Sequence, residues 1–152
     1  MIYAILAAAI FFLDLKIKDW VEREATEEEE QKIGKGCLLL RKYHNKGAFL
    51  NLGKNNRVLV KVVSIVLTLA ATVLFLVTFS FRGSRLLKTG LALLLGGAYS
   101  NTYDRIHRHY VVDYVSFPVK NKTIRRIVFN ISDFCIMIGA LCMALGSVEL
   151  EK

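Results

Sequence analysis

Residues 101–133 read NTYDRIHRHYVVDYVSFPVKNKTIRRIVFNISD, a basic segment that joins two strongly apolar stretches of the chain. Three aspartates, Asp104, Asp113 and Asp133, occur where the apolar stretches meet this segment. A carboxylate at membrane depth is energetically costly and by default marks a functional site. Two carboxyl groups that lie close together share a proton, and this is the basis of aspartyl acid–base chemistry. We therefore predict that Asp113 and Asp133 form such a pair.

The composition is typical of a polytopic membrane protein. Of the 152 residues, 54% are hydrophobic and only one is proline. We expect an all-α integral membrane protein in which four transmembrane helices and a small extracytoplasmic β element form one domain, residues 1–152. The predicted helices cover about residues 2–21, 58–81, 86–103 and 128–148, and the β element covers about residues 22–57.

The predicted β element contains an acidic run and a turn. Residues 22–35 are strongly charged, with four glutamates in a row at residues 27–30, and we interpret them as a solvated extension of the first helix. Residues 37–52 have a strand-like composition that is interrupted by the turn signal Asn45-Lys46-Gly47. Small residues that let helices approach closely in lipid occur in the third predicted helix, namely Gly90, Gly96, Gly97, Ala98 and Ser100.

The net charge of +8 is compatible with nucleic-acid binding, but the basic residues lie in short loops beside apolar runs. This placement favours contact with anionic lipid headgroups over nucleic acid. Lys and Arg are concentrated after the first and third predicted helices, and the positive-inside rule would place those loops in the cytoplasm. Cys37, Cys135 and Cys142 lack metal-ligand spacing, and their odd number argues against a disulfide framework.

The residues around the aspartates predict how each acid is held. As a strand, residues 110–117 would direct Asp113 to the same face as Val111 and Val115. Apolar surroundings of this kind raise the affinity of a carboxyl group for its proton. On the fourth predicted helix, Asn130 and Asp133 are three residues apart, so the amide can orient the acid.

The end of the third predicted helix carries Asn101, Asp104 and Arg105 on one face. Arg105 offers a fork of donors to a carboxylate or a phosphate. An interfacial ion pair between Asp104 and Arg105 would explain Asp104 equally well as a structural residue. Taken singly, Asp113 and Asp133 could each merely cap a helix or a turn.

If Asp113 and Asp133 meet, one activates a water against a peptide carbonyl and the other protonates the leaving amine. This is the logic of an aspartyl peptidase. A competing hypothesis is a proton-coupled transporter, in which Asp104, Asp113 and Asp133 form a relay, but a relay needs acids spread through the bilayer. A metal site at His107 and His109 is disfavoured because no carboxylate or thiol nearby has suitable spacing.

The motifs around these residues resemble those of the signal peptidase II family, the lipoprotein signal peptidases. The matching stretches are SNTYDR at residues 100–105 (family G-N-x-x-D-R), VVDY at 111–114 (V-V-D-F) and FNISDF at 129–134 (F-N-x-A-D-S). Further matches are GGA at 96–98, NKGAF at 45–49 (N-x-G-A-A-F) and DLKIK at 14–18 (D-x-x-[ST]-K). The matches occur in family order over nearly the whole chain, which makes them specific as a set.

The resemblance implies an intramembrane aspartyl endopeptidase that cleaves the signal peptide of diacylglyceryl-modified prolipoproteins just before the lipidated cysteine. It implies no metal or other cofactor. The protein would be a multi-pass monomer of the bacterial cytoplasmic membrane with both termini in the cytoplasm, an orientation opposed by the charge bias. Catalysis would fall to Asp113 and Asp133, and the supporting residues implied are Asn45, Asn101, Asp104, Arg105, Asn130, Asp14 and Lys18.

Four positions depart from the family pattern. Ser100 replaces glycine, Ser132 replaces alanine, Phe134 replaces serine and Ile17 replaces a hydroxyl residue. Both predicted catalytic acids are present, so we expect an active peptidase. Its substrate preference is expected to be altered, because Ser132 and Phe134 flank Asp133. The alternative is a catalytically silent relative that binds lipidated peptides.

Overall fold

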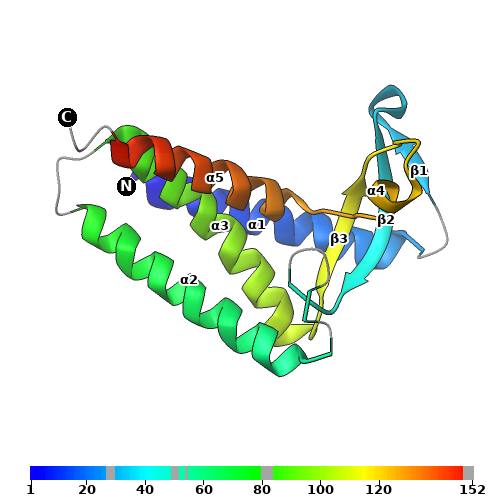
Figure 1. Ribbon diagram of the computed structural model, residues 1–152, viewed down its shortest axis with the longest axis horizontal. Helices are drawn as coiled ribbons and strands as arrows, with labels where there is room; N and C mark the ends of the chain where they lie inside the picture. The colour runs from blue at the N-terminus through cyan, green and yellow to red at the C-terminus, as the bar shows by residue number, and fades with distance from the viewer. Residues whose placement is uncertain (27–29, 49–51, 54, 80–83, 149–152) are drawn as a thin grey trace.

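The computed structural model describes residues 1–26, 30–48, 52–53, 55–79 and 84–148 (Figure 1). The first three glutamates of the acidic run, residues 27–29, lie outside this part of the chain, as does Phe49 of the predicted turn motif. The described residues are mostly helical, with one small sheet of three strands.

Four long helices account for most of the described chain, and their bounds are α1 (Ile2–Glu24), α2 (Arg57–Phe79), α3 (Arg85–His107) and α5 (Ile131–Val148). They lie where the apolar runs predict helices. By length and composition, one described helix, over Arg57–Thr78, is long and apolar enough to cross a membrane. A shorter apolar helix covers Ile131–Ser147.

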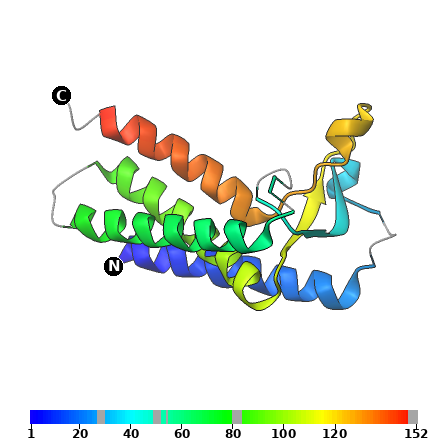
Figure 2. The same cartoon turned by 60° about the horizontal axis from the view of Figure 1, so that its bottom comes forward.

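The helix α3 occupies the centre of the helical part and contacts α1, α2 and α5 (Figures 1 and 2). An apolar cluster of Leu91, Ala92 and Leu95 on α3 with Phe75 on α2 fills the space between these helices. Burial of such side chains is the main favourable contribution to helix packing in the part of a protein that lies outside lipid, whereas close van der Waals contact dominates within lipid.

Helices α3 and α5 pack closely because glycines lie in their interface. A Cβ atom at position 90 would lie 2.6 Å from the carbonyl oxygen of Gly139, and one at position 97 would lie 2.5 Å from the carbonyl oxygen of Ser132. No side chain fits at either position without moving the partner helix. The small residues predicted for the third helix therefore include the ones that allow this approach.

The sheet lies at the end of the helices opposite to the N-terminus and the last turn of α5 (Figure 1). Its strands are β1 (Gln31–Ile33), β2 (Leu38–Asn45) and β3 (Val111–Ser116), all antiparallel in the order β1-β2-β3. The register pairs Asn45 with Val111 and Tyr43 with Asp113. The short elements η1 (Gly34–Gly36) and α4 (Lys122–Arg125) lie in the connections.

Several boundaries differ from the sequence predictions. The helix α1 ends at Glu24, so it includes only the first three residues of the charged segment that was expected to extend it, and within that segment Gln31–Ile33 form strand β1. The sheet also includes β3, which lies far outside the predicted β element, because β2 pairs with it across the chain. Finally, α3 continues past Tyr103 to His107.

The fourth predicted helix begins later than expected. Instead of starting a helix at Val128, the chain pairs Phe129 with Val115 through two backbone hydrogen bonds of 2.7 Å. The helix α5 begins only at Ile131. Asn130 is therefore the residue that precedes the helix, and it does not lie on a helical face with Asp133.

We predict that Gly97→Ala destabilises the protein, because the added methyl group would collide with the backbone of Ser132. Overpacking of this kind typically costs about 1–3 kcal/mol. The melting temperature of the purified protein in detergent micelles measures the effect. Ala140→Leu is the control, because Ala140 is exposed on α5 beside Gly139. An equal loss in both variants would contradict the close packing of α3 against α5.

Candidate active site

Asp113 lies in the middle of β3 with a side chain that is only 1% exposed. The amide of Asn130 donates a hydrogen bond of 2.7 Å to its Oδ1, and the amide of Asn45 donates one of 3.0 Å to its Oδ2. Strand pairing explains the second contact, since Asn45 ends β2 beside the start of β3. Each carboxyl oxygen of Asp113 therefore has an amide donor.

Asp133 is held at the start of α5 by a reciprocal cap. The backbone N–H of Asn130 donates to Asp133 Oδ2 at 3.1 Å, and the backbone N–H of Asp133 donates to Asn130 Oδ1 at 2.9 Å. This arrangement is the capping box of a helix N-terminus. The side chain of Asn101 donates to Asp133 Oδ1 at 3.0 Å.

A hydrogen bond to its side-chain oxygen orients each of three asparagine amides, so that the NH₂ group of each faces a carboxylate. Lys18, which can only donate, contacts Asn101 Oδ1 at 2.8 Å. The backbone N–H of Gly47 donates to Asn45 Oδ1 at 3.0 Å, and the backbone of Asp133 does the same to Asn130. Because each amide oxygen already accepts a hydrogen bond, the NH₂ groups must face Asp113 or Asp133.

The two predicted acids border one cavity of about 430 Å³, together with Asn45, Asn101 and Arg105. Most of the remaining lining is apolar and comes from α2, α3, α5 and the segment that precedes α5, including Leu67, Ala71, Leu94, Phe129, Ile136 and Met137. Asn130 is fully buried and hydrogen-bonds to both acids. The structure thus brings together the five predicted polar residues that line the cavity, with Asn130 behind the two acids.

The environment of Asp113 favours its protonated form. Burial, followed by the negative charge of Asp133, raises the pKa of the Asp113 carboxyl from 3.8 to about 8, although the amides of Asn45 and Asn130 act in the opposite direction. This raised pKa favours a proton on Asp113 at neutral pH. A protonated acid beside an ionised one is the arrangement that aspartyl acid–base chemistry requires.

Arg105 adds a positive charge to the cavity wall. Its guanidinium donates to the backbone oxygens of Asn101 and Gly47, both at 3.1 Å, which ties the end of α3 to the turn after β2. Its buried Nε has no hydrogen-bond partner among the described residues. The ion pair between Asp104 and Arg105 that was considered from the sequence does not form; Asp104 has other partners.

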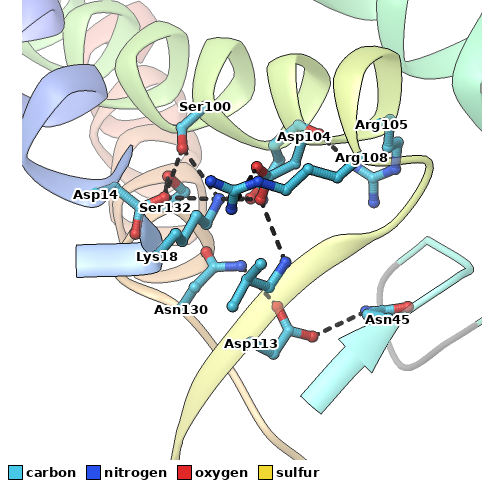
Figure 3. A network of polar contacts seen from close by, with 12 residues as sticks. Asp14, Lys18, Asn45, Ser100, Asp104, Arg105, Arg108, Asp113, Asn130 and Ser132 are labelled. Atoms are coloured by element: carbon cyan, nitrogen blue, oxygen red, sulfur yellow. Dashed lines mark hydrogen bonds and ion pairs between the residues drawn. The ribbon is translucent and has the colours of Figure 1, made fainter. Parts of the chain in front are cut away.

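Asp104, Asp14 and Lys18 lie behind the cavity in a buried ionic cluster (Figure 3). The Lys18 ammonium lies 2.8 Å from Asp14 and 3.1 Å from Asp104. Asp104 also pairs with Arg108 at 3.2 Å and accepts the backbone N–H of Val112 at 3.2 Å. These acids are thus paired in a support for the site, and they do not line the cavity.

Sequence reasoning did not predict the hydrogen bonds of Ser100 and Ser132, the two serines that depart from the family pattern. Ser100 donates to Asp14 Oδ2 at 2.6 Å, and Ser132 donates to the same oxygen at 2.5 Å (Figure 3). Tyr114, also unassigned, donates to Asp14 Oδ1 at 2.7 Å. The signal was present, because both serines replace residues without a hydroxyl in the family pattern, but their common partner is visible only in three dimensions.

The other two departures are apolar contacts. Ile17 packs against the cluster of Val21, Leu40, Val112 and Tyr114. The ring of Phe134 contacts the rings of Phe117 and Phe129. Neither Ser132 nor Phe134 is among the described residues that line the cavity. Any effect of these two residues on substrate preference must therefore act through their neighbours.

The two histidines of the basic segment are separate from the acids. The ring of His107 lies against that of Tyr103, with 4.2 Å between centroids, and His109 is exposed with a positive φ of 66°. Within the described ranges, no group of three or more His, Cys, Asp or Glu side chains is placed to hold a metal ion.

Comparison with known proteins agrees with the motifs. The family model "Signal peptidase (SPase) II" matches residues 6–149. A lipoprotein signal peptidase of Halothermothrix orenii is 30% identical over 152 residues, which cover all of this chain and 98% of that protein. A lipoprotein signal peptidase of Caldicellulosiruptor bescii is 33% identical over 144 residues, which cover 94% of this chain and 88% of the relative.

The fold is similar to that of two solved structures that are described as bacterial membrane enzymes. One has a TM-score of 0.81 at 17% identity and covers 97% of this chain and 87% of its own. The other has a TM-score of 0.77 at 18% identity and covers 94% of this chain and 90% of its own. At these identities the likeness concerns the fold alone. The family match over residues 6–149 and the full-length relatives show that this chain belongs to the signal peptidase II family.

Proposed function

We propose that this protein is an aspartic endopeptidase that cleaves the signal peptide of prolipoproteins, with Asp113 and Asp133 as its catalytic pair. One observation carries the proposal: two acids of different elements border one mostly apolar cavity, and the side chain and backbone of Asn130 hydrogen-bond to both. In the family's reaction the substrate is diacylglyceryl-modified, and the bond broken is the one before the lipidated cysteine.

In the proposed mechanism, Asp133 acts as the base and takes a proton from a water that attacks the peptide carbonyl. Asp113 holds the proton of the pair at neutral pH and passes it to the leaving amine as the C–N bond breaks. The peptide acid and the free amine are the products. After proton exchange with water, the pair again holds one proton, which restores the starting state.

The three asparagines would position the acids. Asn45 and Asn130 orient Asp113, and Asn101 orients Asp133, each through an amide that is itself held from behind. Lys18 would fix Asn101 and thereby link the ionic cluster to the site. Arg105 would place a positive charge beside the bound substrate, because it lines the wall of the same cavity.

A multi-pass monomer in the cytoplasmic membrane is the arrangement we propose, with four membrane-crossing helices and the sheet on the outer side as one domain. The sheet lies at one end of the helices, and the start of α1 and the end of α5 lie at the other end (Figure 1). This grouping supports the proposed arrangement. The basic residues that contradict this orientation are partly neutralised, for example Arg108 by Asp19 and Asp104.

The remaining hypotheses find less support. A proton relay would use Asp104, but Asp104 is fully buried between Lys18 and Arg108 outside the cavity. A catalytically silent relative would bind the substrate through the same cavity without cleaving it, and the substitutions of the two acids described next distinguish it from an enzyme.

Asp113→Asn and Asp133→Asn should each lower cleavage of a lipidated precursor by a factor of about 10²–10⁴ or more, because each removes one partner of the acid–base pair. Gel-shift analysis of precursor and mature lipoprotein in detergent micelles measures the rate. Asp19→Asn is the matched control, since Asp19 is half-exposed and lies outside the cavity. Unchanged turnover in either variant of the pair would refute the proposal.

Activity should fall as the pH rises through about 8, because Asp113 then loses the proton that the pair shares. The free energy of unfolding should also fall as the pH rises. Folding raises this pKa from 3.8 to about 8, so the stabilisation by the bound proton is fully present at low pH and is lost as the pH rises through about 8. The profile of kcat/KM against pH tests the first statement. Melting curves of Asp113→Asn, which should lack this pH-dependent component, test the second; an unchanged pH dependence would contradict it.

Ser132→Ala should lower the free energy of unfolding by about 1.5–3 kcal/mol, because it removes a hydrogen bond to the buried charged group of Asp14. Ser147→Ala is the control on the same helix, since the hydroxyl of Ser147 is exposed and bonds only to the backbone of Ala144. Chemical unfolding in micelles compares the two variants. Equal stability of both would show that the hydroxyl at position 132 does not support Asp14.

A further inference from the structure

A second cavity, of about 260 Å³, adjoins the candidate active site and shares Asn45 and Arg105 with it. The polar side chains that line this cavity but not the first come from three places: the turn after β2 (Lys46), the first turns of α2 (Arg57 and Lys61) and the residues that follow α3 (His109 and Tyr110). The cavity therefore lies where the sheet meets the start of α2.

The charge around this cavity is uniformly positive. Lys46, Arg57, Lys61 and Arg105 contribute four cations, and none of the described residues that line the cavity is acidic. Within the described ranges, Lys46, Arg57 and Lys61 form no ion pair; by comparison, Arg41, Lys42 and Arg108 each have an acidic partner. The acids near Arg105 offset part of its charge, but like charges that converge at Lys46, Arg57 and Lys61 without an ion-pair partner among the described residues are destabilising. The cluster therefore fits an anion that is supplied from outside.

Arg105 provides a second observation that points to a ligand. Its buried Nε has no hydrogen-bond partner in the described part of the protein, although the terminal nitrogens are satisfied by backbone oxygens. An unsatisfied buried donor costs free energy, and a phosphate oxygen is a strong acceptor for a guanidinium.

The surface beside the cavity is apolar. On α2, Val58, Val62 and Val66 follow one another along the helix and are 68%, 48% and 57% exposed. Lys61 lies between Val58 and Val62 in sequence, is half-buried and lines the cavity. A ligand that combines an anionic head with hydrocarbon chains would match both surfaces.

We propose that this basic cavity binds the phosphate group of an anionic phospholipid, whose acyl chains lie along the exposed face of α2. A phosphodiester can accept several hydrogen bonds from Arg57, Lys61 and Arg105, and its charge offsets part of the positive excess. The bound lipid would then form part of the wall beside the active site, through the shared Arg105 and Asn45.

The proposal is tested on the full-length protein in neutral detergent micelles, with phosphatidylglycerol and phosphatidylcholine of identical acyl chains as probes. Native mass spectrometry quantifies the lipid retained by the native protein and by Arg57→Gln/Lys61→Gln. The matched control is Lys35→Gln/Lys120→Gln, which removes the same charge from exposed positions outside both cavities. We expect phosphatidylglycerol to bind preferentially to the native protein and the control, and about tenfold or more weakly to the cavity variant.

Lys61→Arg provides a check on folding, because it keeps the charge and should keep the preference for phosphatidylglycerol. Equal binding of both lipids, or equal retention by the cavity variant and the control, would overturn the proposal. Glycerol 3-phosphate and a glutamate-rich peptide serve as competitors. If either displaces the lipid from the native protein at comparable concentration, the lipid assignment is wrong.

The outcome is independent of the proposed peptidase function. Cleavage of a lipidated precursor in neutral micelles should be nearly unchanged in Arg57→Gln/Lys61→Gln, because neither residue borders the catalytic cavity. Loss of lipid preference with intact cleavage supports the lipid site. Loss of cleavage in the Asp113 and Asp133 variants alone leaves this inference intact.

Discussion

The buried ammonium of Lys18 is the interaction on which the arrangement of the other elements depends. It is 0% exposed, and it contacts Asp14 on its own helix and Ser100, Asn101 and Asp104 on α3. Asp14 accepts hydrogen bonds from Ser132 on α5 and Tyr114 on β3, and Asp104 accepts one from the backbone N–H of Val112 on β3. A charge without water is stable only when every donor and acceptor around it is paired. The need to pair this buried cation therefore fixes three helices and a strand relative to one another.

The candidate active site lies next to this cluster. Lys18 orients Asn101, and Asn101 orients Asp133, so the buried charge of Lys18 is linked to Asp133 through one neutral amide. The amide keeps the cation from pairing directly with the acid, which would hold that acid permanently ionised. Asn130 repeats this logic, because its cap of α5 simultaneously places an amide on Asp113. Helix capping and strand pairing thus hold both acids in place.

The two cavities divide the binding surface by chemistry. The first is mostly apolar with a few convergent polar groups, which suits a peptide that carries hydrocarbon chains. The second is basic and opens beside the apolar face of α2. Arg105 borders both, so it lies between a mostly apolar cavity that contains two acids and a basic cavity. The restriction of most exposed large apolar side chains to the helices is consistent with lipid around the helical part.

The amino-acid sequence by itself determined the helical stretches, the turn after residue 45, the strand around Asp113 and the family, because these depend on local composition and on short motifs. Asp113, Asp133 and their asparagines were also identifiable, since polar groups are rare in such surroundings. Only the tertiary structure decided that β3 joins the sheet, that Asn130 caps α5, that Asp104 pairs with Lys18 and Arg108, and that Ser100 and Ser132 share Asp14 as their acceptor. The pairing of β3 with β2 and the contacts of Lys18 with Asp104 and of the two serines with Asp14 join residues far apart along the chain, so they arise only when packing brings their elements together. The contacts of Asp104 with Arg108 and of Asn130 with Asp133 are local, but the helix boundaries that make them possible are set by the pairing of Phe129 with Val115 and by the extension of α3.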